Sequence, residues 1–66
     1  MQKKIFVDGM FDDDTAAKVA AAVKAVAGVA NCEANPMKAQ VLVDFEGADE
    51  GAIDAAISSA GVTVLG

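Results

Sequence analysis

Hydrophobic residues recur with two different periods along the first half of the chain. Residues 3–8 alternate, with Ile5 and Val7 on one face, which predicts a strand. Residues 16–27 carry apolar residues at spacings of three and four, which is typical of an amphipathic helix, and alanine strengthens that prediction. The inner face of this helix is predicted to hold Ala16, Val19, Ala20, Val23, Val26 and Ala27. Gly28 stands where a left-handed residue would end this helix.

The second half of the chain continues with two strands, a helix and a short strand. Residues 29–35 and 39–45 alternate on either side of a turn that contains Pro36, so we expect an antiparallel hairpin. Asp49 is a suitable N-cap for a helix that ends before Gly61. The inner face of this helix is predicted to hold Ala52, Ile53, Ala56, Ile57 and Ala60, and residues 62–65 form the last strand.

The order strand, helix, strand, strand, helix, strand predicts an α+β fold. It is the ferredoxin-like βαββαβ arrangement, in which right-handed crossovers place both helices on one face of a four-stranded antiparallel sheet. We expect residues 1–66 to form a single domain. A core of this size supplies only about 3–5 kcal/mol of net stability.

Composition narrows the possible functions. The net charge is −5, from ten acidic residues against five lysines, so a phosphate backbone and an anionic membrane surface would both be repelled. No apolar run reaches the roughly 18–20 residues that span a bilayer, and we expect a soluble, cytoplasmic monomer. The chain lacks histidine, the usual acid–base residue near neutral pH, so we do not expect an enzyme. A single cysteine excludes an internal disulfide and a Cys–Cys metal pair.

The segment that leads from the first strand into the first helix resembles the metal-binding loop of heavy-metal-associated domains. That family loop reads Gly-Met-x-Cys-x-x-Cys, and Gly9 and Met10 match its first two positions. Asp12 and Thr15 stand at the two cysteine positions. The resemblance covers nearly all 66 residues, and its other matches are Ile5-x-Val7, Ala16-x-x-Val19, Gly28-Val29, Val41-x-Val43-x-Phe45 and Ile57-x-x-Ala60-Gly61.

The resemblance implies a relative of copper chaperones, mercury-binding proteins and the N-terminal modules of copper-transporting ATPases. Family members bind soft metal ions through two thiolates, whereas Asp12 offers hard carboxylate oxygen and Thr15 a neutral hydroxyl. Many bacterial members also carry a tyrosine near the metal, where this chain has Val62. We therefore expect no soft-metal binding and a non-catalytic role, as an interaction or accessory module of a metal-handling system with a protein partner.

The acidic run Asp12-Asp13-Asp14 leaves three interpretations open. Carboxylates stabilise a helix N-terminus, and one of them, or Thr15, can cap the helix. The same carboxylates, at the family's metal-loop positions, could bind a divalent hard ion such as Ca²⁺, Mg²⁺ or Mn²⁺ weakly. They could also form an acidic docking patch for a protein. No other cofactor is expected.

Two sulfur-containing side chains are predicted to be structural. Cys32 faces the same side of its strand as Ala34, which favours a small buried hydrophobe over a metal ligand. Met10 is expected to pack beneath the loop.

Overall fold

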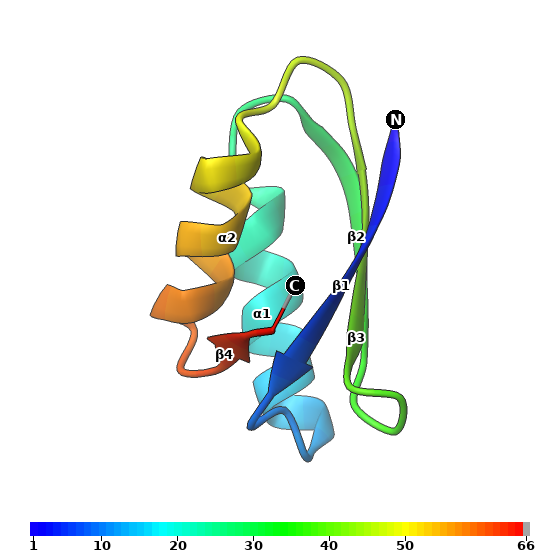
Figure 1. The fold of residues 1–66 in the computed structure, drawn as a ribbon, viewed down its shortest axis with the longest axis vertical. Helices are drawn as coiled ribbons and strands as arrows, with labels where there is room; N and C mark the ends of the chain where they lie inside the picture. The colour runs from blue at the N-terminus through cyan, green and yellow to red at the C-terminus, as the bar shows by residue number, and fades with distance from the viewer. Residues whose placement is uncertain (66) are drawn as a thin grey trace.

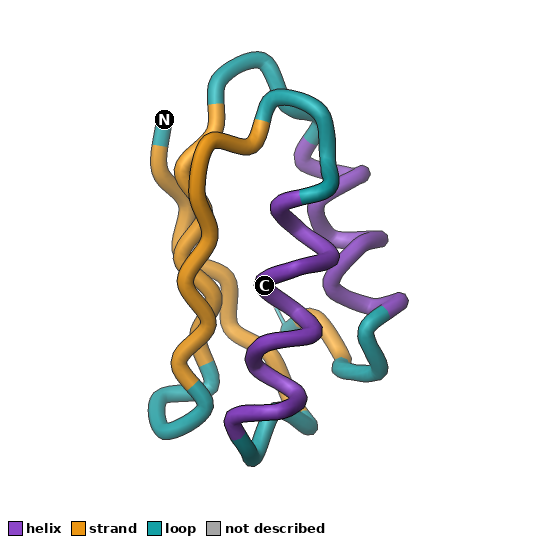
Figure 2. Tube along the Cα trace, turned by 180° about the vertical axis from the view of Figure 1, so that it is seen from behind, coloured by secondary structure: helices purple, strands orange, loops and turns teal. Residues whose placement is uncertain are grey.

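The computed structural model describes residues 1–65 and has the predicted ferredoxin-like architecture. One antiparallel sheet has the strand order β2-β3-β1-β4, and both helices lie on the same side of it (Figure 1). The view from behind shows the same two layers, with the three long strands on one side and the helices on the other (Figure 2). The elements are β1 (Gln2–Asp8), α1 (Asp13–Lys24), β2 (Val29–Asn35), β3 (Gln40–Phe45), α2 (Glu50–Ser59) and β4 (Thr63–Val64).

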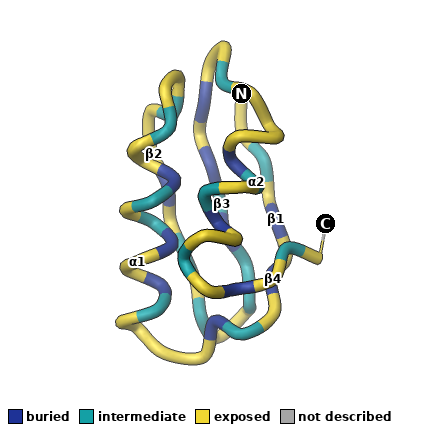
Figure 3. Tube along the Cα trace, turned by 90° about the vertical axis from the view of Figure 1, so that its left-hand side faces the viewer, coloured by how far each residue is buried: buried dark blue, intermediate teal, exposed yellow. Residues whose placement is uncertain are grey.

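The hydrophobic core lies between the sheet and the helices. The alternation of β1 turns Ile5 and Val7 inward, each 1% exposed, while the side chain of Phe6 between them points to the other face of the sheet and is 46% exposed. The buried residues therefore follow the inner faces of all the long elements (Figure 3). The fully buried side chains of the other elements include Val19, Val23, Val41, Val43, Ile53 and Ile57. None of the helices within residues 1–65 has both the length and the hydropathy needed to cross a bilayer.

Helix α1 is shifted toward the N-terminus relative to the sequence prediction of residues 16–27. It begins at Asp13 because Asp12 caps it, and it ends at Lys24, where Ala25 is the C-cap residue. The predicted role of Gly28 as the residue that ends the helix was therefore wrong. Gly28 does have a positive φ of 92°, but it lies in the turn before β2, where its carbonyl accepts a hydrogen bond from the amide of Glu46 at 2.8 Å.

The predicted inner faces of the two helices were too wide by one alanine each. Ala27 lies beyond the end of α1 and is exposed, and Ala52 in the first turn of α2 is exposed as well. The prediction for β2 was confirmed at both ends, and β3 begins one residue later than expected, because Ala39 adopts a positive φ of 52°. Edge strand β2 contains a register shift between Val29 and Asn31 where it pairs with β3.

Candidate functional site

The loop between β1 and α1 is held by a glycine and a buried methionine. Gly9 has a φ of 96°, which a residue with a Cβ rarely adopts, and it turns the chain out of β1. Met10 is 1% exposed and belongs to the core, as expected from the sequence. Phe11 is 84% exposed, so the chain leaves the core between these two residues and passes over the surface before the helix begins.

Asp12 is the N-cap residue of α1. Its backbone is extended, its Oδ1 atom accepts a hydrogen bond from the backbone N–H of Thr15 at 2.8 Å, and its carbonyl oxygen accepts one from the N–H of Ala16 at 3.1 Å. Hydrogen bonds from the side chain and the backbone of Thr15 favour the ionised carboxylate and lower the pKa of Asp12. The capping hydrogen bond thus links the two positions at which the family loop has cysteines.

The three consecutive carboxylates do not converge. Asp13 and Asp14 occupy the exposed first turn of α1, where the positive end of the helix dipole favours acidic side chains. No group of three or more His, Cys, Asp or Glu residues within the described part of the chain is arranged so that it could hold a metal ion. The structure brings Asp12 and Thr15 together, and it leaves Asp13 and Asp14 as separate exposed acids.

The turn that follows α2 lies beside this loop. A Cβ atom built on Gly9 would lie 3.9 Å from the Cα atom of Val62 and 4.0 Å from the carbonyl oxygen of Gly61. Val62 is 5% exposed and belongs to the core. The position where many bacterial family members carry a tyrosine therefore does lie next to the loop, and here it contributes an aliphatic side chain without a hydroxyl group.

Cys32 lies on β2, within the sheet, and not in the loop. It is 4% exposed, it pairs with Val43 across the β2–β3 ladder, and it belongs to the hydrophobic core, which confirms the expected structural role. Desolvation by burial raises the pKa of the Cys32 thiol and outweighs the nearby Lys24 ammonium, which lowers it. The thiol is consequently neutral near pH 7, and a neutral thiol is a poor soft-metal ligand.

Comparison with known proteins agrees with this fold. Residues 4–63 match the model of the heavy-metal-associated domain, and the chain belongs to that family. No curated protein sequence matches. Among solved structures, a CopZ metallochaperone superposes with a TM-score of 0.94 at 24% identity and covers 98% of this chain and 100% of its own.

Two further structures illustrate the range of similar proteins. A copper binding domain from HMA7, a P-type ATPase, has a TM-score of 0.90 at 25% identity and covers 96% of this chain and 88% of its own. CopP from Helicobacter pylori, in its apo form, has a TM-score of 0.85 at 24% identity, with 98% of this chain and 100% of that chain covered. The likeness in fold is close, whereas sequence identity is low.

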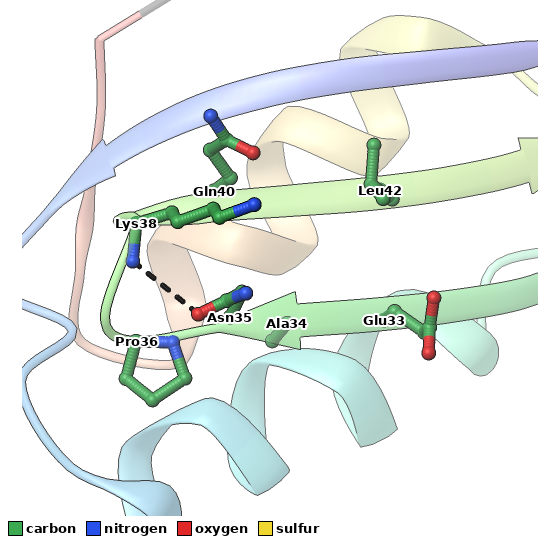
Figure 4. A pocket seen from close by; sticks show the side chains of 7 residues that line it. All are labelled: Glu33, Ala34, Asn35, Pro36, Lys38, Gln40 and Leu42. Atoms are coloured by element: carbon green, nitrogen blue, oxygen red, sulfur yellow. Dashed lines mark hydrogen bonds between the residues drawn. The ribbon is translucent and has the colours of Figure 1, made fainter.

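One surface feature was missed by the sequence analysis. A hollow of about 230 Å³ lies at the hairpin end of β2 and β3, and it is lined by Glu33, Ala34, Asn35, Pro36, Lys38, Gln40 and Leu42 (Figure 4). The sequence did contain one sign of this surface. The alternation of the strands places Leu42 and Phe6 on the face that the helices do not cover. The concavity itself depends on the strand register and the hairpin turn, which alternation does not specify.

Proposed function

We propose that this chain is a non-catalytic heavy-metal-associated domain that does not bind soft metal ions and acts as an interaction or accessory module of a metal-handling system. The observation that carries the proposal is the hydrogen bond between Asp12 Oδ1 and the Thr15 amide at 2.8 Å. In the family pattern these two positions supply thiolates, and in this chain they supply the cap of α1.

The chemistry of the available donors supports this proposal. Cu(I) and other soft ions select thiolate and thioether ligands, and the loop offers carboxylate and hydroxyl oxygen instead. The sulfur of Met10 is buried in the core, and the neutral thiol of Cys32 lies in the sheet. The similar structures include a metallochaperone and a domain of a P-type ATPase, so we propose a protein of such a system as the partner.

A thermal melt with and without metal tests the loss of soft-metal binding. A ligand that binds only the folded state must stabilise that state, by about 2.7 kcal/mol at a hundredfold excess over its Kd. We expect Cu(I), Zn(II) and Cd(II) to leave the Tm of the natural chain unchanged. A Tm that rises with the concentration of any of these ions would reject the proposal.

The matched gain-of-function variant is Asp12→Cys/Thr15→Cys, which restores the family spacing of two cysteines. We expect this variant to take Cu(I) from a competing chelator and to show a raised Tm with the metal, because the scaffold around the loop is intact. If the natural chain competes for Cu(I) as well as the variant does, the loop binds soft metal despite its oxygen donors.

Weak binding of a divalent hard ion is the second candidate function, and the exposed carboxylates of Asp13 and Asp14 motivate it. Hard cations prefer oxygen ligands, and these two side chains are free of the capping bond that occupies Oδ1 of Asp12. Titration of labelled protein with Ca²⁺, Mg²⁺ and Mn²⁺ tests this function through the amide resonances of residues 11–16. No shift at millimolar ion would exclude it, and shifts confined to these amides would support it.

A further inference from the structure

The face of the sheet opposite the helices carries exposed apolar side chains in the middle of a polar surface. No element within residues 1–65 covers this face (Figure 1). Phe6 is 46% exposed and Leu65 is 65% exposed. The two residues are neighbours, because the backbone N–H of Leu65 donates to the carbonyl oxygen of Phe6 at 2.8 Å. We call this surface the open face.

The hollow of about 230 Å³ lies on the open face, on the other side of β3 from Phe6 (Figure 4). The register shows this arrangement, since Gln40 on β3 pairs with Phe6 on β1 and with Asn35 on β2. The hollow is open to solvent, and Leu42 and Pro36 give it apolar surface that a phenyl ring could contact. A protruding aromatic side chain and a hollow that could receive it thus occupy the same cross-strand row.

The adjacent row has charges of opposite sign on either side of an apolar residue. Leu42 on β3 pairs with Lys4 on β1 and with Glu33 on β2. Lys4 and Glu33 are both exposed, and β3 lies between the two strands that carry them. This row therefore has a positive, an apolar and a negative side chain on three neighbouring strands that lie about 4.8 Å apart.

A two-fold axis that runs along β3, above the open face, makes both rows complementary to themselves. Such an axis places β1 of one copy over β2 of the other, and both sheets keep the same strand direction, as in aligned sheet packing. Phe6 then faces the partner's hollow, and Lys4 faces the partner's Glu33, and each contact occurs twice. We propose that the occupant of the open face is a second copy of this chain, bound in this isologous arrangement.

The distribution of charge over the whole molecule favours this face for self-association. Six of the ten carboxylates belong to the two helices and their N-caps, on the other layer of the molecule: Asp12, Asp13, Asp14, Asp49, Glu50 and Asp54. With a net charge of −5, contact between two helix faces would bring like charges together. Contact between two open faces keeps these carboxylates on the outside of the dimer. The proposed axis does place Asp44 opposite the partner's Asp44, and each of these carboxylates lies 3.9 Å from the N-terminal ammonium of its own chain, whose positive charge offsets it.

The size of the molecule sets the expected strength of the dimer. Its principal extents are 29 × 19 × 18 Å, so two apposed faces together bury less than the roughly 1,200–2,000 Å² of a specific, stable interface. We therefore expect a transient dimer with a Kd on the order of 0.1–1 mM. The monomer expected from the sequence remains the main species at micromolar concentration.

Sedimentation equilibrium of the full chain from about 20 µM to about 2 mM tests the proposal, with the Kd as the readout. We expect the Phe6→Ser variant to raise the Kd at least about tenfold, because a hot-spot aromatic carries much of the energy of a small interface. The Phe11→Ser variant is the matched control, since Phe11 is an exposed phenylalanine on the loop and should leave the Kd unchanged. Far-UV circular dichroism checks that each variant is folded.

Charge reversal tests the orientation of the two copies. Lys4→Glu alone and Glu33→Lys alone should each raise the Kd about tenfold, because each places like charges opposite one another. The double variant keeps the net charge of −5 and should restore a Kd close to that of the natural chain. Lys18→Glu on α1 changes the net charge as Lys4→Glu does, and serves as its control.

The proposal is overturned by any of three results. The natural chain sediments as a monomer at 2 mM, or the Phe6→Ser variant dimerises as well as the natural chain, or the double charge reversal does not recover dimerisation lost in the single variants. None of these readouts involves a metal ion, so the outcome is independent of the function proposed for the loop.

Discussion

At the scale of single residues, the aspartate at the first cysteine position of the family loop has a structural role of its own as a helix cap. Asp12 stands at a position where the family pattern has a thiolate ligand, and that position is the N-cap of α1. An aspartate there accepts a hydrogen bond from the Thr15 amide, which would otherwise lack an intrahelical partner. The side chain of Asp12 therefore ties the loop to the first turn of α1.

The contribution of Asp12 can be measured by removing its side chain. The Asp12→Ala variant loses the cap and is expected to melt about 4–8 °C below the natural chain at neutral pH. Asp13→Ala is the control, because Asp13 is an exposed acid in the first turn that accepts no capping bond. Equal losses of Tm in the two variants would show that helix charge, and not the cap, accounts for the effect.

The difference in Tm between the natural chain and the Asp12→Ala variant should also depend on pH. The pKa of Asp12 is lower in the folded chain than in the unfolded one, so its stabilising contribution is fully present above the unfolded value. That contribution is lost as the pH falls through the lower, folded value. The difference in Tm between the natural chain and Asp12→Ala should therefore be constant near neutral pH and should vanish in acid. A difference that grows in acid would contradict the sign of the shift.

At the scale of elements, periodicity predicted the type and order of all six helices and strands, and it did not fix where α1 begins and ends. Four consecutive residues at its start, Asp12 to Thr15, are all suitable N-caps, so the sequence left the first helical residue undetermined. At its other end, alanine-rich sequence favours helix wherever tertiary structure allows it. The position of Gly28 is explained by a contact between distant segments, and such a contact cannot be recognised from local pattern.

Gly28 and Gly47 offer a matched test of that contact. Both have a positive φ, so an added Cβ strains either backbone, which costs about 1–2 kcal/mol. At Gly28 the Cβ would also lie 2.8 Å from the backbone N of Ala48 and 2.9 Å from the carbonyl oxygen of Glu46, whereas at Gly47 nothing lies within 4 Å. Gly28→Ala should therefore lower the urea midpoint more than Gly47→Ala does, and equal shifts would show that strain alone matters.

The loop was predictable from the sequence to a greater extent than the open face. The loop positions are consecutive in the chain, so the identity of Asp12 and Thr15 could be compared directly with the family pattern. The open face combines residues from β1, β2 and β3, and their adjacency follows from the observed register. Since a shift of one residue turns every side chain of a strand to the opposite face, alternation alone could not define that surface.

At the scale of the whole molecule, a 66-residue chain depends on a few fully buried side chains. Ile53 on α2 is 0% exposed and packs between the helices and the sheet. Truncation of a buried isoleucine to alanine costs about 2–5 kcal/mol, which is comparable with the roughly 3–5 kcal/mol that so small a core supplies.

Ile53→Ala should therefore be largely unfolded at 25 °C. Ile53→Val removes one methylene group, costs about 0.5–1.5 kcal/mol and should remain folded with a lower Tm. Circular dichroism of both variants measures the difference. A cooperative melt of Ile53→Ala at the Tm of the natural chain would show that other contacts hold α2 in place.

The register shift in β2 has a consequence for the solubility of the chain at high concentration. An edge strand offers unpaired N–H and C=O groups that can template further strands and so start a cross-β fibril. The irregularity between Val29 and Asn31 interrupts the repeat of β2 and so hinders the addition of a further strand at that edge. Concentrated solutions of this domain should consequently stay free of thioflavin-positive fibrils.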